Sequence, residues 1–343
     1  MCTEIYNKNE KFYMDILKKS SSYKDLLDFN EINNLIIQNS INRIIKKLNN
    51  IINQTSYDNA SRIIPIIISS GIDHSPLYYI LKNIVHNWKI IHIPNPPVDV
   101  RIFFHIYTCI IEELGLEILL DISLNSVKKK IAHTCVKIVR IYSLSDNRRE
   151  VAMRWLLGEY LNAQELSYLN IKFDIKDDDI SLEMIKLISE NTDNILVLYF
   201  DEIEGAYKNY GEEAEEAKRK ILESIKRLHH YIKKLSIIII NSKELWAKIL
   251  DLAGPSLSST LEQELEIKPF NLIDFKKFVA NSMEIYWKKN NVIPPSNPFY
   301  PLNEKLIEIF FHETKGNPRL FVKFCNKFIE KIIKEELSLE QLI

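Results

Sequence analysis

Glycine is scarce in this sequence, with only 7 among 343 residues. Cysteine is rarer still, and Cys2, Cys109, Cys135 and Cys325 are scattered without a Cys-x-x-Cys pair. This spacing argues against a zinc site and a disulfide framework, and it favours a reducing compartment. We therefore expect a cytoplasmic protein.

Long hydrophobic runs are also missing. No stretch approaches the ~20 apolar residues of a membrane span, and the first residues are too polar for a signal peptide. We expect no membrane partner. The formal net charge is −1, so bulk charge points to no particular partner. With 46% hydrophobic and 27% charged residues, the composition is that of an ordinary globular protein, long enough for two domains or one large one.

The strongest pattern is a run of six apolar residues, Ile195 to Phe200, followed at once by Asp201 and Glu202. A run this short and apolar predicts a strand buried on both faces, as in a parallel sheet. Ligands of such sheets bind at the carboxyl ends of the strands. Two carboxylates at that place could coordinate a metal ion or activate a water molecule. The alternative is a strand that simply ends in a polar helix cap.

An earlier strand, Ile63 to Ile68, leads through a loop into a helix that begins near Leu77. Pro65 either weakens this strand or marks its start. A phosphate-binding loop would be built here, and its consensus needs two glycines and a lysine before Ser or Thr. This loop has one glycine and no lysine. The nearest counterparts of the consensus are Ser70, Gly71, His74 and Ser75.

A further strand, Ser236 to Ile240, ends in Asn241, which either shares a site with Asp201 or only caps the next helix. From Asn271 the pattern is helical throughout, and Gly316-Asn317-Pro318-Arg319 separates two helices. Residues 1–57 are predicted as an N-terminal helical arm, packed on the core or binding a partner. Residues 58–270 are predicted as an α/β core, and residues 271–343 as a helical lid.

Local helix boundaries can be predicted as well. The N-terminal helices should end in a polar loop at 53–59. Residues 102–120 and 126–139 are expected to be helical, and Ser145 or Asp146 should cap a helix from Arg148 to Leu157. Cys109 and Cys135 fall in apolar helices and are expected in the core.

This order of strands, polar tips and helical lid resembles the AAA+ and signal-transduction (STAND-like) branch of the P-loop ATPases. The block from Arg154 to Tyr160, with Glu165 and Leu166, resembles one in prokaryotic ATP-binding proteins of the BREX phage-defence type. The fold of those proteins is also similar to that of origin-recognition ATPases. The resemblance implies an α/β fold: a three-layer parallel sheet of P-loop NTPase (AAA+) type with an N-terminal helical arm and a C-terminal helical lid.

The resemblance also implies roles for individual residues. Asp201 would coordinate Mg²⁺, and Glu202 would activate the attacking water. Asn241 would be the sensor on the neighbouring strand. Arg319 would be the lid arginine that reaches the γ-phosphate of ATP, although it could instead only pair with a carboxylate.

Two departures from the family pattern weigh against catalysis. The phosphate loop, a degenerate Walker A motif, lacks its lysine, and no Lys or Arg lies between Lys248 and Lys268, where an arginine finger is expected. An arginine finger alone is worth about 10³–10⁵ in rate. We therefore predict a pseudo-ATPase with no bound cofactor that acts in assembly or recognition. Its partner would be DNA, an active ATPase subunit or another copy of the chain.

Arg148, Arg149 and Arg154 form the candidate DNA-contacting patch, because clustered cations hold phosphates. The alternative is an ordinary solvated helix surface. A second functional hypothesis is an atypical active ATPase of a DNA-processing or phage-defence system. It would bind ATP and Mg²⁺, and a lysine from elsewhere, such as Lys82, would replace the missing one.

Overall fold

The computed structural model describes residues 12–18, 27–69, 71–73, 75–85, 87–96, 101–122, 133–144, 147–201, 203, 212–268 and 270–334. The chain forms two compact units. The sheet unit comprises Arg43–Ile68 and Leu77–Glu266. The lid unit comprises Met1–Asn42, Ser69–Pro76 and Ile267–Ile343. The turn between the first strand and the following helix therefore belongs to the lid unit.

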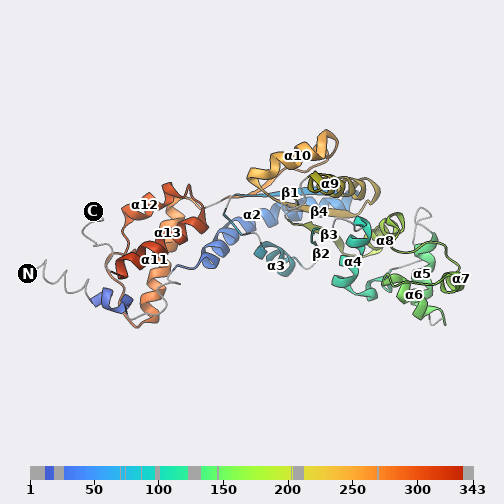
Figure 1. The fold of residues 1–343 in the computed structure, drawn as a ribbon, viewed down its shortest axis with the longest axis horizontal. Helices are drawn as coiled ribbons and strands as arrows, with labels where there is room; N and C mark the ends of the chain where they lie inside the picture. Colours follow the sequence, from blue (N-terminus) through green and yellow to red (C-terminus); the bar gives the residue numbers. More distant parts are fainter. Residues whose placement is uncertain are drawn as a thin grey trace, which may run out of the picture. The chain divides into compact units, whose positions relative to one another are not determined.

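A five-stranded parallel sheet forms the middle layer of the sheet unit (Figure 1). Its strand order is β2-β3-β4-β1-β5, so the strand before Asp201 lies inside the sheet, between β2 and β4, and β5 is an edge. The strands are β1 (Arg62–Ile68), β2 (Trp88–Ile93), β3 (Ile195–Phe200), β4 (Leu235–Ser242) and β5 (Leu265–Ile267). All six residues of β3 are buried, which is why that strand is apolar throughout.

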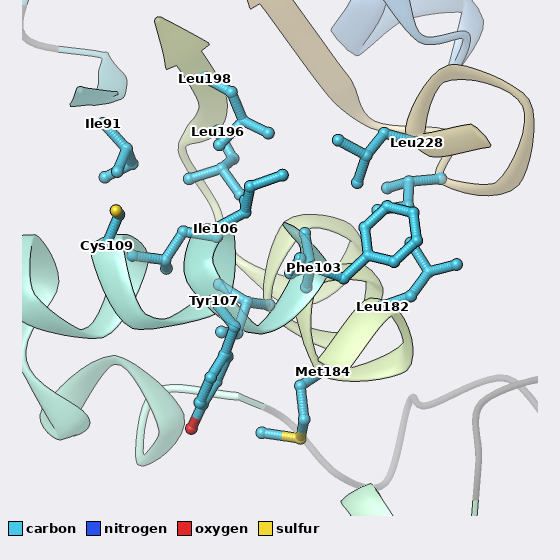
Figure 2. Close-up of a cluster of buried hydrophobic side chains, with 14 of the residues drawn as sticks. Ile91, Phe103, Ile106, Tyr107, Cys109, Leu182, Met184, Leu196, Leu198 and Leu228 are labelled. Carbon is cyan, nitrogen blue, oxygen red and sulfur yellow. The ribbon is translucent and has the colours of Figure 1, made fainter. Parts of the chain in front are cut away.

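Helices cover both faces of the sheet. Leu196, Leu198 and Phe200 of β3 point into one large core, together with side chains from α4, α8, α9 and α10. Figure 2 shows part of this core, where Phe103 and Ile106 of α4 and Leu228 of α9 surround Leu196 and Leu198. The helices of this layer are α4 (Ile102–Leu114), α8 (Asp178–Asn191), α9 (Glu212–Tyr231) and α10 (Lys243–Ser258).

The opposite face carries those parts of α2 (Phe29–Asp58) and α3 (Ser75–Ile84) that belong to the sheet unit, from Arg43 and Leu77 onward. The Thr55 and Ser236 hydroxyls lie 3.2 Å apart, and the Tyr78 ring of α3 lies 5.5 Å from that of Tyr199. The predicted three-layer α/β fold around a parallel sheet is confirmed. The polar loop predicted at 53–59 is wrong, because α2 continues to Asp58 and the chain turns at Asn59, where φ is +58°.

The connection between β2 and β3 carries a helical insertion: η2 (Leu116–Leu119), α5 (His133–Ser143), α6 (Arg149–Leu156) and α7 (Ala163–Leu169). The single helix predicted over 102–120 is broken, because Gly115 at φ +73° ends α4 before η2 begins. Of the helix predicted over 126–139, residues 133–139 are helical in α5, and residues 126–132 lie outside the described part of the chain. The N-cap of α6 is Arg148, so the prediction of Ser145 or Asp146 is wrong; both residues lie outside the described part of the chain. Cys109 and Cys135 are buried, as predicted.

Pro65 lies in the middle of β1, against expectation. The Ile63 carbonyl accepts a hydrogen bond from the Glu262 N–H on the β5 side of the strand, at 2.8 Å. Because alternate residues of a strand face the same side, the Pro65 nitrogen also points toward β5. Counting on from the Ile63–Leu261 pair places Pro65 opposite Gln263, which lies outside β5. The missing N–H therefore falls at a gap in the ladder.

The C-terminal part of the lid unit contains three helices: α11 (Leu272–Lys289), α12 (Glu304–Glu313) and α13 (Pro318–Ile333). The N-terminal helical segment 12–18 packs on them, with the Tyr13 ring 5.3 Å from Trp287 and Leu17 fully buried. The Asn326 side chain exchanges two hydrogen bonds with the Leu27 backbone. Among the described helices, none is both long and apolar enough to cross a membrane.

Candidate nucleotide-binding residues

Two of the predicted site residues lie on neighbouring strands at the carboxyl edge of the sheet, and strand alternation turns their side chains to opposite faces. Asp201 follows directly on β3, and β3 pairs with β4 in a register that sets Phe200 beside Ile239. Asn241 lies two residues further along β4, pairs with Ile67 of β1 and is 1% exposed. Asn241 is thus a buried residue within the strand. It does not cap α10, whose N-cap is Ser242.

Three rings lie on the sheet face next to Asp201. Tyr199 points to the same face as Asp201, two residues further on. Its ring lies 5.5 Å from Tyr78 of α3 and 6.1 Å from His92 of β2. Burial raises the pKa of the Tyr199 hydroxyl, and the Asp201 carboxylate raises it further. The hydroxyl is buried and finds no hydrogen-bond partner within the described part of the chain.

Substituting Tyr199→Phe tests this orphan hydroxyl. Removing a buried polar group that lacks a partner is expected to raise the free energy of unfolding by about 1 kcal/mol. Tyr107→Phe is the matched control, because the Tyr107 hydroxyl is also buried but donates to the Leu156 carbonyl at 2.8 Å. That variant should lose about 1 kcal/mol in urea denaturation. Equal losses in the two variants would show that Tyr199 has a partner.

Two backbone donors of the turn between β1 and α3 form hydrogen bonds within the protein. The Ser69 N–H donates to the Ile267 carbonyl, and the Ile72 N–H donates to the Ser69 carbonyl, both at 3.4 Å. A phosphate-binding loop aims such N–H groups at the ligand. Ser70 and His74 lie outside the described residues, as does Glu202, while Ser75 is the first residue of α3.

Gly71 has a packing role in this turn. Its φ is +80°, and a Cβ built on it would fall well inside van der Waals contact of Asn317 Oδ1. Asn317 is the N-cap of α13, and the same Oδ1 accepts from the Leu320 N–H at 3.1 Å. The loop's glycine therefore allows close approach of the Asn317 side chain. Arg319, two residues on, lies exposed in the first turn of α13.

Lys82, the candidate replacement for the missing lysine, already has an acidic partner. Its Nζ forms an ion pair with Glu113 of α4 and lies 5.7 Å from the Tyr78 ring centre. The hydrogen bond to Glu113 raises the pKa of Lys82. Lys82 thus belongs to an ion pair at the surface that joins α3 to α4. No group of three or more His, Cys, Asp or Glu residues with metal-binding geometry occurs among the residues that the structure describes.

The three candidate DNA-contacting arginines differ in their surroundings. Arg154 is held by Glu159, at 2.9 Å, by Glu165, and by the Tyr160 carbonyl, at 3.1 Å. Its charge is therefore matched by two carboxylates, which leaves little attraction for phosphate. Arg149 is exposed and lies 5.3 Å from the Tyr142 ring centre, and Arg148 is the N-cap of α6.

The arrangement around Arg154 predicts a structural role. Substituting Arg154→Gln should lower the thermal midpoint, because it releases both α7 and the loop before it from α6. DNA affinity should stay unchanged in a fluorescence anisotropy titration. A loss of DNA affinity with an unchanged thermal midpoint would contradict this assignment and return Arg154 to the phosphate-contacting set.

Comparison with known proteins assigns no family to this chain. No protein-family model matches the sequence, and neither does any curated protein. A solved structure of the Aeropyrum pernix ORC1 protein in complex with DNA is similar, with 11% identity and a TM-score of 0.35. The match covers 81% of this chain and 56% of that one. A likeness this distant adds nothing to what the strand order already shows.

Proposed function

We propose that this chain is a catalytically degenerate AAA+-like protein, a pseudo-ATPase that acts in assembly or recognition. The turn between β1 and α3 carries the proposal. It has no lysine, its Gly71 faces Asn317, and the N–H groups of Ser69 and Ile72 donate to protein carbonyls. The residues present at this turn do not fit a triphosphate.

The size of the effect follows from the missing donors. A hydrogen bond to a charged group contributes about 1.5–3 kcal/mol. Two backbone donors turned away from the ligand would thus weaken nucleotide binding by about 10²- to 10⁴-fold. The absent lysine removes a further charge contact with the β- and γ-phosphates. Asp201, Glu202, Asn241 and Arg319 keep residue types suited to Mg²⁺ and phosphate, but under this proposal they have no nucleotide to act on.

Isothermal titration calorimetry with Mg-ATP tests the proposal on the full chain. We expect no saturable binding up to about 1 mM nucleotide, in the unmodified protein and in Asp201→Ala alike. Micromolar binding that Asp201→Ala abolishes would overturn the proposal. If Lys82→Ala abolished such binding as well, the chain would be an atypical ATPase with a displaced lysine.

DNA is the partner that the arginines of the insertion favour within this proposal. Arg140 is exposed near the end of α5, and Arg148 and Arg149 begin α6. Replacing Arg148 and Arg149 by Gln should weaken duplex binding and flatten its salt dependence between about 50 and 200 mM salt. Arg154→Gln is the matched control. Equal binding by all three proteins would leave an ATPase subunit or a second copy as the partner.

A further inference from the structure

The exposed face of α13 carries an apolar stripe. Leu320 and Phe324 are 43% and 45% exposed, and Phe328, one turn further on, is half-buried. Spacing by four places these side chains on one side of the helix. The two phenylalanines pack against α12, because the Phe310 ring lies 6.1 Å from that of Phe324 and 5.2 Å from that of Phe328. We call these three residues the α13 stripe.

A row of lysines runs beside the stripe. Lys323, Lys327 and Lys331 follow the same four-residue spacing, each displaced by one residue, and all three are exposed. No ion pair joins any of them to another described residue. Other lysines of the lid unit are paired: Lys276 with Glu304 and Glu308, at 2.8 and 2.6 Å, and Lys334 with Glu330 at 2.6 Å. The lysine row is thus an unneutralised cationic edge along an exposed apolar surface.

We propose that the α13 stripe and its lysine row bind an amphipathic helix of a partner protein, with an apolar stripe flanked by Glu or Asp. Side chains spaced by three and four residues match the ridges of another helix. Charges flanking such a seam set the choice of partner, as in coiled coils. DNA phosphates would use the lysines but would leave Leu320 and Phe324 in water. This partner chemistry goes beyond the proposed function and uses residues of the lid unit alone.

A designed peptide provides the probe. It is a fluorescein-labelled, 21-residue helix with Leu at the a and d heptad positions and Glu at e and g. A second peptide has Lys in place of Glu. Fluorescence anisotropy with the full chain should show saturable binding of the Glu peptide and none of the Lys peptide. Higher salt should weaken the binding.

Two variants separate the apolar and charged parts. Phe324→Ser should weaken Glu-peptide binding by roughly tenfold. The double variant Lys323→Glu/Lys327→Glu should lose the Glu peptide and gain the Lys peptide. The control is Ile273→Ser/Lys277→Glu on α11 of the same unit. These two residues are exposed and lie four positions apart, as Lys323 and Lys327 do. This control variant should bind as the unmodified protein does.

Several results would overturn the inference. These are no binding of the Glu peptide at about 100 μM, equal loss in the α11 control, or failure of the charge reversal to exchange the preferred peptide. Tighter binding of single-stranded DNA or anionic vesicles, lost in the same α13 variants, would assign the face to those ligands. This test does not involve Mg-ATP binding. The peptide result and the proposed function can therefore each be overturned without the other.

Discussion

Gly71→Ala is expected to lower the free energy of unfolding by about 2–5 kcal/mol. Alanine at φ +80° carries about 1–2 kcal/mol of backbone strain. Its Cβ would also collide with the Asn317 side chain, and forcing such a neighbour aside costs about 1–3 kcal/mol. The measurement is urea denaturation followed by tryptophan fluorescence.

Two controls separate strain from collision. Gly254 has a similar φ of +71° but no atoms within 4 Å of a built Cβ, so Gly254→Ala should show the strain alone. Asn317→Gly removes the obstructing side chain, and glycine is nearly as good an N-cap as asparagine, within a few tenths of a kcal/mol. In the Gly71→Ala background it should restore about 1 kcal/mol or more. If Gly71→Ala costs no more than Gly254→Ala, the turn does not seat on Asn317.

Trp155→Ala should cost about 3–5 kcal/mol. Trp155 is almost fully buried in the helical insertion, and its Nε1 donates to the Phe173 carbonyl at 3.0 Å. Close packing continues at Gly158, where a built Cβ would lie 2.7 Å from the Phe104 ring. The block from Arg154 to Tyr160 is therefore expected to act as the structural centre of the insertion.

The matched controls are neighbours of the same block. Leu157 is about half-exposed, so Leu157→Ala should change the free energy of unfolding by less than about 0.5 kcal/mol. Trp155→Phe keeps much of the buried ring but leaves the Phe173 carbonyl without its donor, so we expect an intermediate loss of about 1–3 kcal/mol. A small loss in Trp155→Ala, with partner binding abolished, would instead make the block a recognition surface.

Local sequence signals were enough to predict the strands. β1, β3 and β4 are continuous apolar runs, and such a composition indicates strands that are buried on both faces. The polar residues Asp201 and Asn241 can be located in the same way, because each follows one of these runs. Lid helices α12 and α13 were visible from spacing and from the break at Gly316 to Arg319. The capping box of Asn162 and Glu165 could also have been found from its Asn-x-x-Glu spacing.

Long-range contacts had no such signal. The residues around Gly71 in the sequence do not predict its contact with Asn317, and those around Lys82 do not predict its ion pair with Glu113. Arg154 looked like a cation for phosphate because its partners, Glu159 and Glu165, come from the next loop and helix. Pro65 looked like a strand breaker because only the pairing register shows that its nitrogen faces a gap. In each case the partner is set by the fold, so composition and spacing could not supply it.

We propose that the turn between β1 and α3 is closed on protein groups and leaves no place for a triphosphate. The most direct test is a crystal structure of the full chain grown with a non-hydrolysable ATP analogue and Mg²⁺ at millimolar concentration. We expect no nucleotide density at the turn, with the Asn317 side chain seated against Gly71. A triphosphate bound by the N–H groups of Ser69 and Ile72, with Mg²⁺ on Asp201, would contradict the account.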